Sequence, residues 1–496
     1  MKGTPHPGLV SHGFTVLAAT LVISLIWIGA FLLGFARNES TTNNYITNVY
    51  GNNGTSNSES TCTIPDLPKC ADTCEFLICE SIPDGMTFDP KYAVYNSTTD
   101  CWMRLMNEAK DEILLGAYYW SLLAEHTGNN FTVDPSNSSA DGVLIYNTLL
   151  QTARDRNVNV RIAQSYDADG TVESENLVKD SNGKIQLRSL NFGNWYPGGI
   201  LHTKSWSVDG KHIYIGSANF DWRSLRQVKE LGIAVFNCPC LGQDLQNLLE
   251  IYWRMGAPGA VIPEKWEDSL STGANHESPM NIPQIIGDQA AFISASPPGF
   301  RACGREDDLT AMIKTIDDAK STLDMAVMDF SPAFLYMHDA NKWMPDLDNA
   351  IRRAAFERGV HVRFMMSLWP HTSKQYISYL RSLAAISPTL PCRGYKGGEC
   401  TDRGIIEVKL VEVPTLTFGD IPYARVYHNK YFVTETTAYV GTSNWSPDYW
   451  TNTAGIGLIL RSDNIGTKSH LVDQIRGVFE RDWYSNYTTL IDDYSG

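Results

Sequence analysis

The stretch His202-Thr-Lys204-Ser-Trp-Ser-Val-Asp209, followed by Gly216-Ser217-Ala-Asn219, decides how the whole chain is interpreted. A second version near the C-terminus reads His428-Asn-Lys430-Tyr-Phe-Val-Thr-Glu435, then Gly441-Thr442-Ser-Asn444. One H-x-K-x4-D pattern is a weak motif, but two copies with a trailing Gly-Ser/Thr-x-Asn are hard to obtain by chance. The pair places two imidazoles, two ammonium groups and two carboxamides at equivalent positions of two half-molecules.

Two further matches, in the same order, indicate an internal duplication. Residues 107–120 are similar to residues 317–330, and residues 153–165 are similar to residues 355–367. Each match reads as a helix leading into a buried strand, which predicts an α/β fold in which helices cover mostly parallel sheets. The alternative to a duplication is that two ordinary αβ segments simply look alike.

The duplication sets the expected domain organisation of the globular part. We expect two α/β sandwich halves, residues 61–265 and 285–496, that form a pseudo-dimer within one chain. Residues 257–284 contain four prolines and little periodicity, so we place the linker between the halves there.

An uncharged run from Phe14 to Ala36 is long enough to cross a bilayer. We expect a cytoplasmic tail at 1–13, a transmembrane anchor at 14–36 and a polar luminal stalk at 37–60, as in a single-pass type II membrane protein. The alternative is a cleaved signal peptide, which would have a shorter apolar run and a nearby small-residue cleavage site.

Sequons and cysteines beyond the anchor both point to an oxidising lumen. The predicted glycosylation sites are Asn38, Asn53, Asn96, Asn130, Asn137 and Asn486. All ten cysteines also follow the anchor, and disulfides between them are expected. We expect Cys238 and Cys240 to pair with the cluster at residues 62–79, and Cys392 with Cys400. A zinc site in the early cluster is the alternative.

The two His/Lys pairs predict phosphodiester chemistry. Asp209-Gly210 is a hairpin signal between two short β-like runs, and alternation along the strand puts His202 and Lys204 on one face. If the halves pack about a pseudo-twofold axis, both pairs meet at the seam. One histidine can then attack phosphorus and the other can protonate the leaving oxygen, while Lys204 and Lys430 bind the non-bridging oxygens. This chemistry needs no metal or other cofactor.

Composition limits how a polyanionic substrate could be held. The formal net charge is −15 and the sequence pI is about 5.2, which argues against a broad basic coat for nucleic acid. A local basic site must therefore bind the phosphate. An acidic compartment would help, because it protonates histidines.

At these residues the chain resembles the phospholipase D superfamily, whose signature H-x-K-x4-D-x6-G-S-x-N the first copy matches in full. The second copy departs at Glu435, at the gap before Gly441 and at Thr442. Glu435, the Gly-Thr-Ser-Asn-Trp run and the N-terminal anchor resemble the branch of endolysosomal five-prime exonucleases, phospholipase D members three and four. The resemblance covers roughly residues 60–490.

The resemblance implies a protein that degrades single-stranded DNA and RNA from the 5′ end in acidic endolysosomes, reached through the endoplasmic reticulum and Golgi. It also implies release of a soluble luminal form. A phospholipid hydrolase or transphosphatidylase using the same site stays open, as does a homo-oligomer. The rival of another class is an inactive scaffold, against which the presence of both histidines and both lysines argues.

The resemblance and the repeat together suggest roles for single residues. We expect Asn219, Asn444, Ser217 and Thr442 to contact substrate. Glu230 lies 28 residues after His202 and is expected to orient it, while the matching position in the second half is Gly455. A carboxylate partner favours imidazolium, so this predicts His202 as the acid and His428 as the nucleophile. Superfamily precedent often gives the first-half histidine the nucleophilic role.

Several residues near the motifs have a plainer interpretation. Asp209 and Glu435, although part of the catalytic motifs, are expected to fix their loops, and a metal site that includes them would be opposed by the two lysines. His371 is treated as a decoy, because its spacing to Lys374 does not fit the H-x-K pattern. The sequon at Asn444 is expected to be unmodified. The following aromatic residues could stack bases, with about half of them expected in the core: Trp206, Phe220, Trp222, Tyr427, Tyr431, Trp445, Tyr449 and Trp450.

Overall fold

The hairpin that carries each His-x-Lys motif lies in the middle of a sheet. The computed structural model describes residues 62–127, 138–166, 171–283, 289–336, 341–416, 421–462 and 470–495. In the first hairpin, Asp209 and Gly210 have φ angles of 50° and 62°, the left-handed geometry of a tight hairpin turn. The expected strand–turn–strand unit is confirmed in both halves.

The first half contains an eight-stranded sheet in the order β2-β1-β10-β8-β7-β3-β5-β6. Its strands and helices are β1 (Glu75–Ser81), β2 (Asn96–Ser97), α2 (Thr98–Glu108), β3 (Glu112–Ala117), β4 (Trp120–Ser121), α3 (Ala140–Arg154), β5 (Asn159–Ser165), α4 (Thr171–Asp180), β6 (Ile185–Leu190), β7 (Lys204–Val208), β8 (His212–Gly216), β9 (Phe220–Asp221), α5 (Trp222–Arg226), β10 (Glu230–Phe236) and α6 (Pro239–Met255).

The second half contains a nine-stranded sheet in the order β11-β12-β20-β19-β18-β13-β14-β17-β21. Its strands and helices are β11 (Met280–Ile282), β12 (Gln289–Ser296), α7 (Asp308–Asp318), β13 (Thr322–Val327), α8 (Asp346–Arg358), β14 (His361–Ser367), α9 (Lys374–Ala385), β15 (Cys392–Lys396), β16 (Glu399–Arg403), β17 (Ile405–Val411), β18 (Lys430–Thr434), β19 (Thr437–Gly441), α10 (Pro447–Thr451), β20 (Gly455–Ser462), α11 (His470–Trp483) and β21 (Thr488–Leu490).

The two sheets repeat one topology. Strands β1-β10-β8-β7-β3-β5-β6 follow one another as β12-β20-β19-β18-β13-β14-β17 do in the second half. The repeated segments seen in the sequence are α2–β3 with α7–β13, and α3–β5 with α8–β14. The duplication and the α/β class are therefore confirmed.

The expectation of mostly parallel sheets is wrong. Only β3-β5-β6 and β13-β14-β17 run parallel within the repeated strands, whereas the pairs from β1 to β3 and from β12 to β13 are antiparallel. The motif hairpins account for the β7–β8 and β18–β19 pairs, because a tight turn can join only antiparallel neighbours. Each sheet is mixed.

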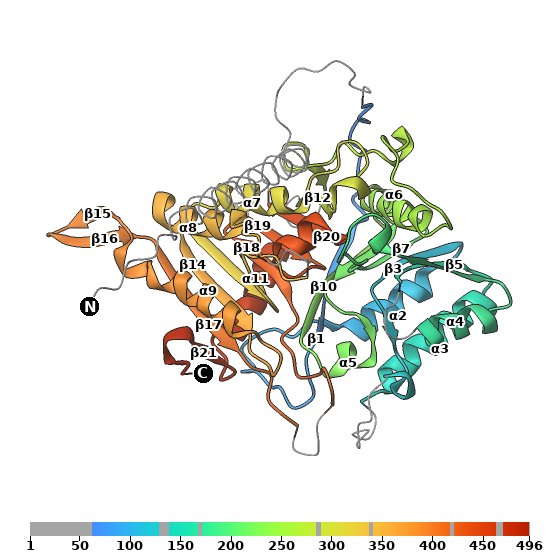
Figure 1. Ribbon diagram of the computed structural model, residues 1–496, viewed down its shortest axis with the longest axis horizontal. Coiled ribbons are helices and arrows are strands. Elements are labelled where there is room, and N and C mark those ends of the chain that lie inside the picture. Colours follow the sequence, from blue (N-terminus) through green and yellow to red (C-terminus); the bar gives the residue numbers. More distant parts are fainter. Residues whose placement is uncertain are drawn as a thin grey trace, which may run out of the picture. The chain divides into compact units, whose positions relative to one another are not determined.

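Helices cover both faces of each sheet, and the sheets meet in the middle of the unit formed by residues 61–496 (Figure 1). In the first half α2 packs on β1 and β10 while α6 packs on β3, β5 and β7. In the second half α7 packs on β12 and β20, and α11 on β13 and β18. At the centre β8 and β10 contact β19, so the two motif hairpins face each other.

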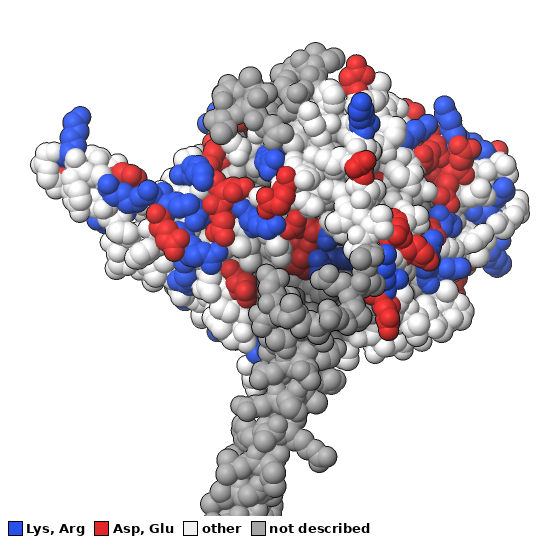
Figure 2. Space-filling view, turned by 90° about the horizontal axis from the view of Figure 1, so that it is seen from above, with Lys and Arg blue, Asp and Glu red and all other residues white. Residues whose placement is uncertain are grey.

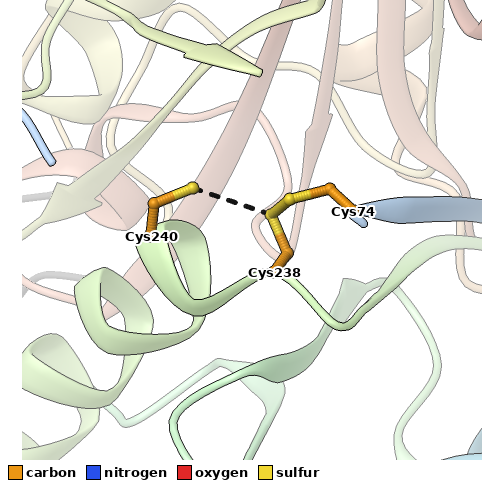
Figure 3. Close-up of side chains that lie close together, drawn as sticks. All are labelled: Cys74, Cys238 and Cys240. Atoms are coloured by element: carbon orange, nitrogen blue, oxygen red, sulfur yellow. Dashed lines mark hydrogen bonds between the residues drawn. A yellow bond between two sulfur atoms is a disulfide. The ribbon is translucent and has the colours of Figure 1, made fainter. Parts of the chain in front are cut away.

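All ten cysteines lie in the described part of the chain and form five disulfides. The pairs are Cys62–Cys303, Cys70–Cys240, Cys74–Cys238, Cys79–Cys101 and Cys392–Cys400. The expected pairing of Cys238 and Cys240 with the early cluster is confirmed, as is the ring closed by Cys392 and Cys400. Three sulfurs of this group, Cys74, Cys238 and Cys240, lie close together (Figure 3). Because all three are in disulfides, none offers a thiolate to zinc.

The N-terminal segments at 1–13, 14–36 and 37–60 fall outside the described residues, as do Asn38, Asn53, Asn130 and Asn137. Within the described ranges, no helix has the length and apolar character to cross a membrane. Asn96 and Asn486 are exposed, as a glycan acceptor must be, while Asn444 is buried.

Candidate active site

The two motif histidines are held where the halves join. Just before β7, Leu201 forms a parallel bridge with Ala454 of the second half, and the His202 amide donates to the Ala454 carbonyl at 2.9 Å. Just before β18, Tyr427 forms the equivalent bridge with Lys229 of the first half. The His428 amide donates to the Lys229 carbonyl at 2.8 Å. Each histidine is therefore positioned by the opposite half.

Both histidines line one cavity of about 620 Å³, a size suited to a small ligand. The His202 ring lies between Tyr118 of the first half and Tyr449 of the second, with ring centroids 4.9 and 5.1 Å away. Residues of both halves line the same space, including Asn219 and Asn444. The predicted convergence of the two motifs on one pocket is confirmed.

The two motif lysines are buried next to the histidines. The Lys204 ammonium donates to the His202 carbonyl at 3.0 Å, and the Lys430 ammonium donates to the His428 carbonyl at 2.7 Å. Burial lowers the pKa of both, that of Lys430 to about 7 and that of Lys204 well below its usual value, with Lys430 adding repulsion. In an acidic medium Lys430 carries a charge that a phosphate can pair with.

The carboxylate Glu230 partners His428 and not His202, which corrects the expected assignment. Nδ1 of His428 lies 2.8 and 2.9 Å from the two Glu230 carboxylate oxygens. Sheet order explains the difference, because β8 lies between β10 and β7 and keeps Glu230 away from the histidine of its own half. Among the described residues, no carboxylate forms an ion pair with His202.

The second half has no room for a matching carboxylate. A Cβ atom on Gly455, at the position equivalent to Glu230, would lie 2.0 Å from Oγ of the buried Ser443. The site is therefore built from two similar halves but is chemically asymmetric.

The different surroundings shift the pKa values of the two imidazoles to different extents. Burial lowers the pKa of His202 far below its usual value, and Lys204 and Lys430 lower it further. Burial also lowers the pKa of His428, but Glu230 opposes the shift. An ionised carboxylate only accepts, so Nδ1 of His428 carries the proton and its Nε2 is the atom left for substrate. His202 is the histidine that stays neutral more readily.

Each motif asparagine meets a different neighbour in the pocket. Nδ2 of Asn219 lies 3.4 Å from the Tyr119 hydroxyl, whereas Nδ2 of Asn444 donates to the Asp329 carboxylate at 3.1 Å. Burial raises the pKa of Asp329 to about 6, opposed by Lys430. Asp329 was missed from the sequence, although the repeat aligns it with Tyr119. That alignment was the signal available, since it places a carboxylate at the end of β13 in the site.

The hydroxyls of Ser217 and Thr442 are bonded to the backbone of neighbouring strands. Oγ of Ser217 bonds to the Leu231 amide, and Oγ1 of Thr442 accepts from the Ile456 amide, both at 3.0 Å. These hydroxyls hold β10 and β20 and do not line the pocket, so their expected contact with substrate stays a prediction.

Asp209 and Glu435 lie at the far ends of β7 and β18. Asp209 accepts hydrogen bonds from the three backbone amides of residues 110–112 at 2.8–2.9 Å, and Glu435 accepts from those of residues 320–322. Their expected role in fixing loops is confirmed. Neither lines the pocket that contains the two histidines.

Most aromatic residues beside the motifs belong to the core. All eight named above are buried, and of these Tyr449 alone lines the pocket, so more of them are structural than expected. Other aromatic residues take the place in the wall: Tyr118, Tyr119, Tyr336, Trp369, Tyr376 and Tyr423. His371, treated as a decoy, also lines it and stacks on Tyr423 with ring centroids 5.1 Å apart.

Outside the pocket, charges of both signs are mixed. Figure 2 shows Lys and Arg interspersed with Asp and Glu over the described residues of that face. With a net charge of −15, the chain has no overall excess of positive charge, and its motif lysines Lys204 and Lys430 are buried beside the two histidines.

The fold and site define a duplicated α/β protein with one composite two-histidine pocket, and sequence comparisons assign its family. A family model described as "PLD3/4, PLD-like domain" matches residues 91–392, and one described as "Cardiolipin synthase, PLD-like domain" matches residues 312–483. The 5′-3′ exonuclease PLD3 of Xenopus laevis is 40% identical, covering 86% of this chain and 83% of that protein.

Two mammalian relatives are similarly close. The 5′-3′ exonuclease PLD4 of Mus musculus is 37% identical over 86% of this chain and 82% of its own length. The 5′-3′ exonuclease PLD3 of Homo sapiens is 38% identical over 85% of this chain and 82% of its own length. The chain belongs to the phospholipase D family, in its PLD3/4 branch.

Proposed function

We propose that the chain is a phosphodiesterase that removes nucleotides from the 5′ end of single-stranded DNA and RNA through a phosphohistidine intermediate. The observation that carries this proposal is the composite pocket, which both motif histidines line although only His428 has a carboxylate partner. The ammonium group of each motif lysine is bonded to the carbonyl of its histidine. Relatives covered over more than four-fifths of their length are 5′-3′ exonucleases, which supports the substrate class.

The unequal histidines assign the steps. Neutral His202 attacks phosphorus, and His428 gives its Nε2 proton to the leaving ester oxygen as the P–O bond breaks. Lys204 and Lys430 stabilise the charge on the non-bridging oxygens. Water then attacks the phosphohistidine, His428 takes the proton of that water, and the P–N bond to His202 breaks. These roles are the reverse of those predicted from the sequence, where Glu230 was expected to partner His202 and to make it the acid.

The pocket wall favours a nucleic acid over a phospholipid. A lipid channel would be lined by aliphatic side chains, whereas aromatic rings such as Trp369, Tyr376 and Tyr423 outnumber the aliphatic side chains here. The charged residues of the wall are Arg223 and the carboxylates Asp221, Glu230 and Asp329, so the aromatic rings carry this preference. Rings of this kind stack on the bases of a single strand. The same site could transfer phosphatidyl groups only if acyl chains found room among these rings.

We also propose an endolysosomal location behind a type II membrane anchor. The apolar run at 14–36, the sequons that follow it and the five disulfides support passage through an oxidising lumen. An acidic lumen also suits a site in which Lys430 must be charged.

The test is digestion of end-labelled single-stranded DNA at acidic pH in EDTA, with and without a 5′ phosphate, beside a phospholipid vesicle assay. Stepwise loss of the 5′ label that both His202→Ala and His428→Ala abolish is expected. Cleavage that begins at the 3′ end, that needs an added metal, or that survives both substitutions contradicts the proposal.

A further inference from the structure

The two bridges that join the halves differ in their side chains. Beside His202 the bridge pairs Leu201 with Ala454, both apolar and fully buried. Beside His428 the equivalent bridge pairs Tyr427 with Lys229, also fully buried. The backbone bonds are alike, 2.9 Å from His202 to Ala454 and 2.8 Å from His428 to Lys229.

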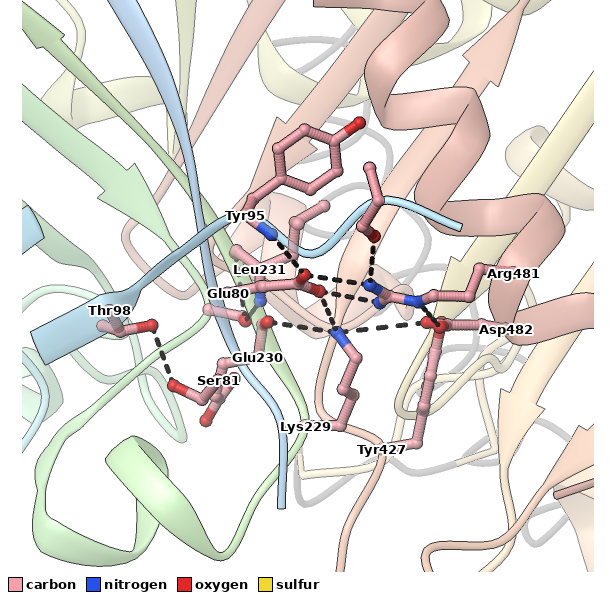
Figure 4. Close-up of polar contacts among 12 residues, drawn as sticks. Glu80, Ser81, Tyr95, Thr98, Lys229, Glu230, Leu231, Tyr427, Arg481 and Asp482 are labelled. Carbon is pink, nitrogen blue, oxygen red and sulfur yellow. Dashed lines mark hydrogen bonds and ion pairs between the residues drawn. The ribbon is translucent and has the colours of Figure 1, made fainter. Parts of the chain in front are cut away.

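Lys229 and Tyr427 lead into a buried cluster of four charges, Glu80, Lys229, Arg481 and Asp482 (Figure 4). The Arg481 guanidinium donates to both Glu80 oxygens at 2.7 and 2.9 Å and to Asp482 at 3.0 Å. The Lys229 ammonium donates to Glu80 at 3.2 Å and lies 3.9 Å from Asp482. The Tyr427 hydroxyl donates to Asp482 at 2.9 Å. Two cations and two anions balance.

Joining the halves does not require this cluster. The apolar bridge at Leu201 and Ala454 holds the same backbone geometry without any charge. Buried ion pairs are, in general, no more stabilising than apolar side chains of similar volume, because the charges lose their hydration. The cluster occurs at the bridge between Lys229 and Tyr427. There the next residue on each strand belongs to the Glu230–His428 pair, because Glu230 follows Lys229 and His428 follows Tyr427.

We propose that Glu80, Lys229, Arg481 and Asp482, together with Tyr427, are positioning residues for the Glu230–His428 pair. Lys229 and Tyr427 are anchored on the side of the bridge away from the pocket. The next residue of each strand is thereby fixed on the pocket side, where both Glu230 oxygens lie within 2.9 Å of Nδ1 of His428. The Lys229 ammonium also lies 3.4 Å from the Glu230 carbonyl, which ties the cluster to the backbone of the pair.

The cluster satisfies its own charges, so Glu230 stays available to His428. Burial alone would raise the pKa of Glu80, but Lys229 and Arg481 hold it at about 2, so it is ionised in any acidic compartment. Burial and the Asp482 carboxylate raise the pKa of Tyr427, which keeps its hydroxyl a donor. In the pocket, His428 faces Glu230, Lys430, Lys204 and His202.

This inference rests on the proposed function, and its test is the substitution Tyr427→Phe, which removes only the hydroxyl bound to Asp482. Tyr439→Phe is the matched control, because that hydroxyl is equally buried and donates to another carboxylate, Asp308, at 3.0 and 3.1 Å. Both variants should lose similar thermal stability. Only Tyr427→Phe should lower kcat, roughly 10-fold with KM little changed, and shift the alkaline limb of the pH profile to lower pH.

The titration of His428, followed by NMR with His428→Gln used for assignment, gives a readout independent of turnover. A lower pKa of His428 in Tyr427→Phe but not in Tyr439→Phe supports the proposal. Wild-type protein that does not cleave DNA contradicts the proposed function alone. Active wild-type protein with equal losses of kcat in both variants, or with an unmoved His428 pKa, overturns the inference. If Tyr427→Phe does not fold, Asp482→Asn, which keeps an acceptor for Tyr427, is measured in the same way.

Discussion

Glu230 of the first half and His428 of the second form a carboxylate–imidazole pair across the seam, with Nδ1 lying 2.8 and 2.9 Å from the two carboxylate oxygens. The equivalent pair does not exist on the other side, where Gly455 stands beside Ser443. One site therefore holds two histidines with different surroundings, and the order of the chemical steps follows from that difference.

Replacing Glu230 by Gln should impair the proton donor. The loss of the carboxylate removes the interaction that raises the pKa of His428, so the pKa falls further. We expect kcat to fall about 100-fold, with the alkaline limb of the pH profile moved to lower pH. Steady-state kinetics across pH measure both effects. A variant with wild-type kcat and an unchanged profile would show that Glu230 does not act on His428.

A substrate whose leaving group needs no proton separates the two histidines. With a thymidine 3′-(p-nitrophenyl phosphate), His428→Ala should still release one burst of nitrophenol per site, because His202 remains as nucleophile. His202→Ala should give no burst. Stopped-flow absorbance measures the amplitude, and the reverse pattern would exchange the two roles.

The Lys430 ammonium should make activity fall steeply above neutral pH. His428 must be protonated to act, and so must Lys430, whose pKa is about 7. In a plot against pH, log kcat/KM should therefore fall with a slope of about −1 above the pKa of His428. Above the pKa of Lys430 the slope should steepen to about −2. In Lys430→Arg the steeper part should vanish, because a guanidinium does not titrate there. A slope that stays steep in this variant assigns the second proton elsewhere.

Asp209→Ala should destabilise the fold without removing the chemistry. Three backbone amides lose their acceptor, for which we expect about 3 kcal/mol of lost unfolding free energy. Asp66→Ala, at an exposed position, is the control and should be near neutral. Denaturant melts measure the difference, and kcat well below the melting temperature should remain close to wild type. A loss of kcat in fully folded Asp209→Ala would contradict the structural role.

The sequence predicted features that repeat or that lie close along the chain. The hairpin turn at Asp209-Gly210, the convergence of His202 and His428, and the pairing of Cys238 with the early cysteines were all accessible in this way. The partner of Glu230 could not be predicted in this way. Its spacing along the chain relates Glu230 to His202, whereas the strand order β10-β8-β7 separates it from His202 and leaves it facing the other half.

The motifs also did not predict which of the nearby aromatic residues are buried in the core. Trp206 and Tyr431 follow the motif lysines by one or two residues, yet the sheet directs them into the core. His371 and Tyr423 reach the pocket from segments with no motif at all. Such contacts are set by the packing of distant segments, which local patterns do not encode.

The central claim is that His202 carries the phosphoryl group. The direct measurement is mass spectrometry of protein mixed briefly with substrate at acidic pH and quenched under denaturing alkaline conditions, where a phosphohistidine survives. The account predicts a nucleotidyl adduct on the peptide containing His202. An adduct on the His428 peptide would contradict it.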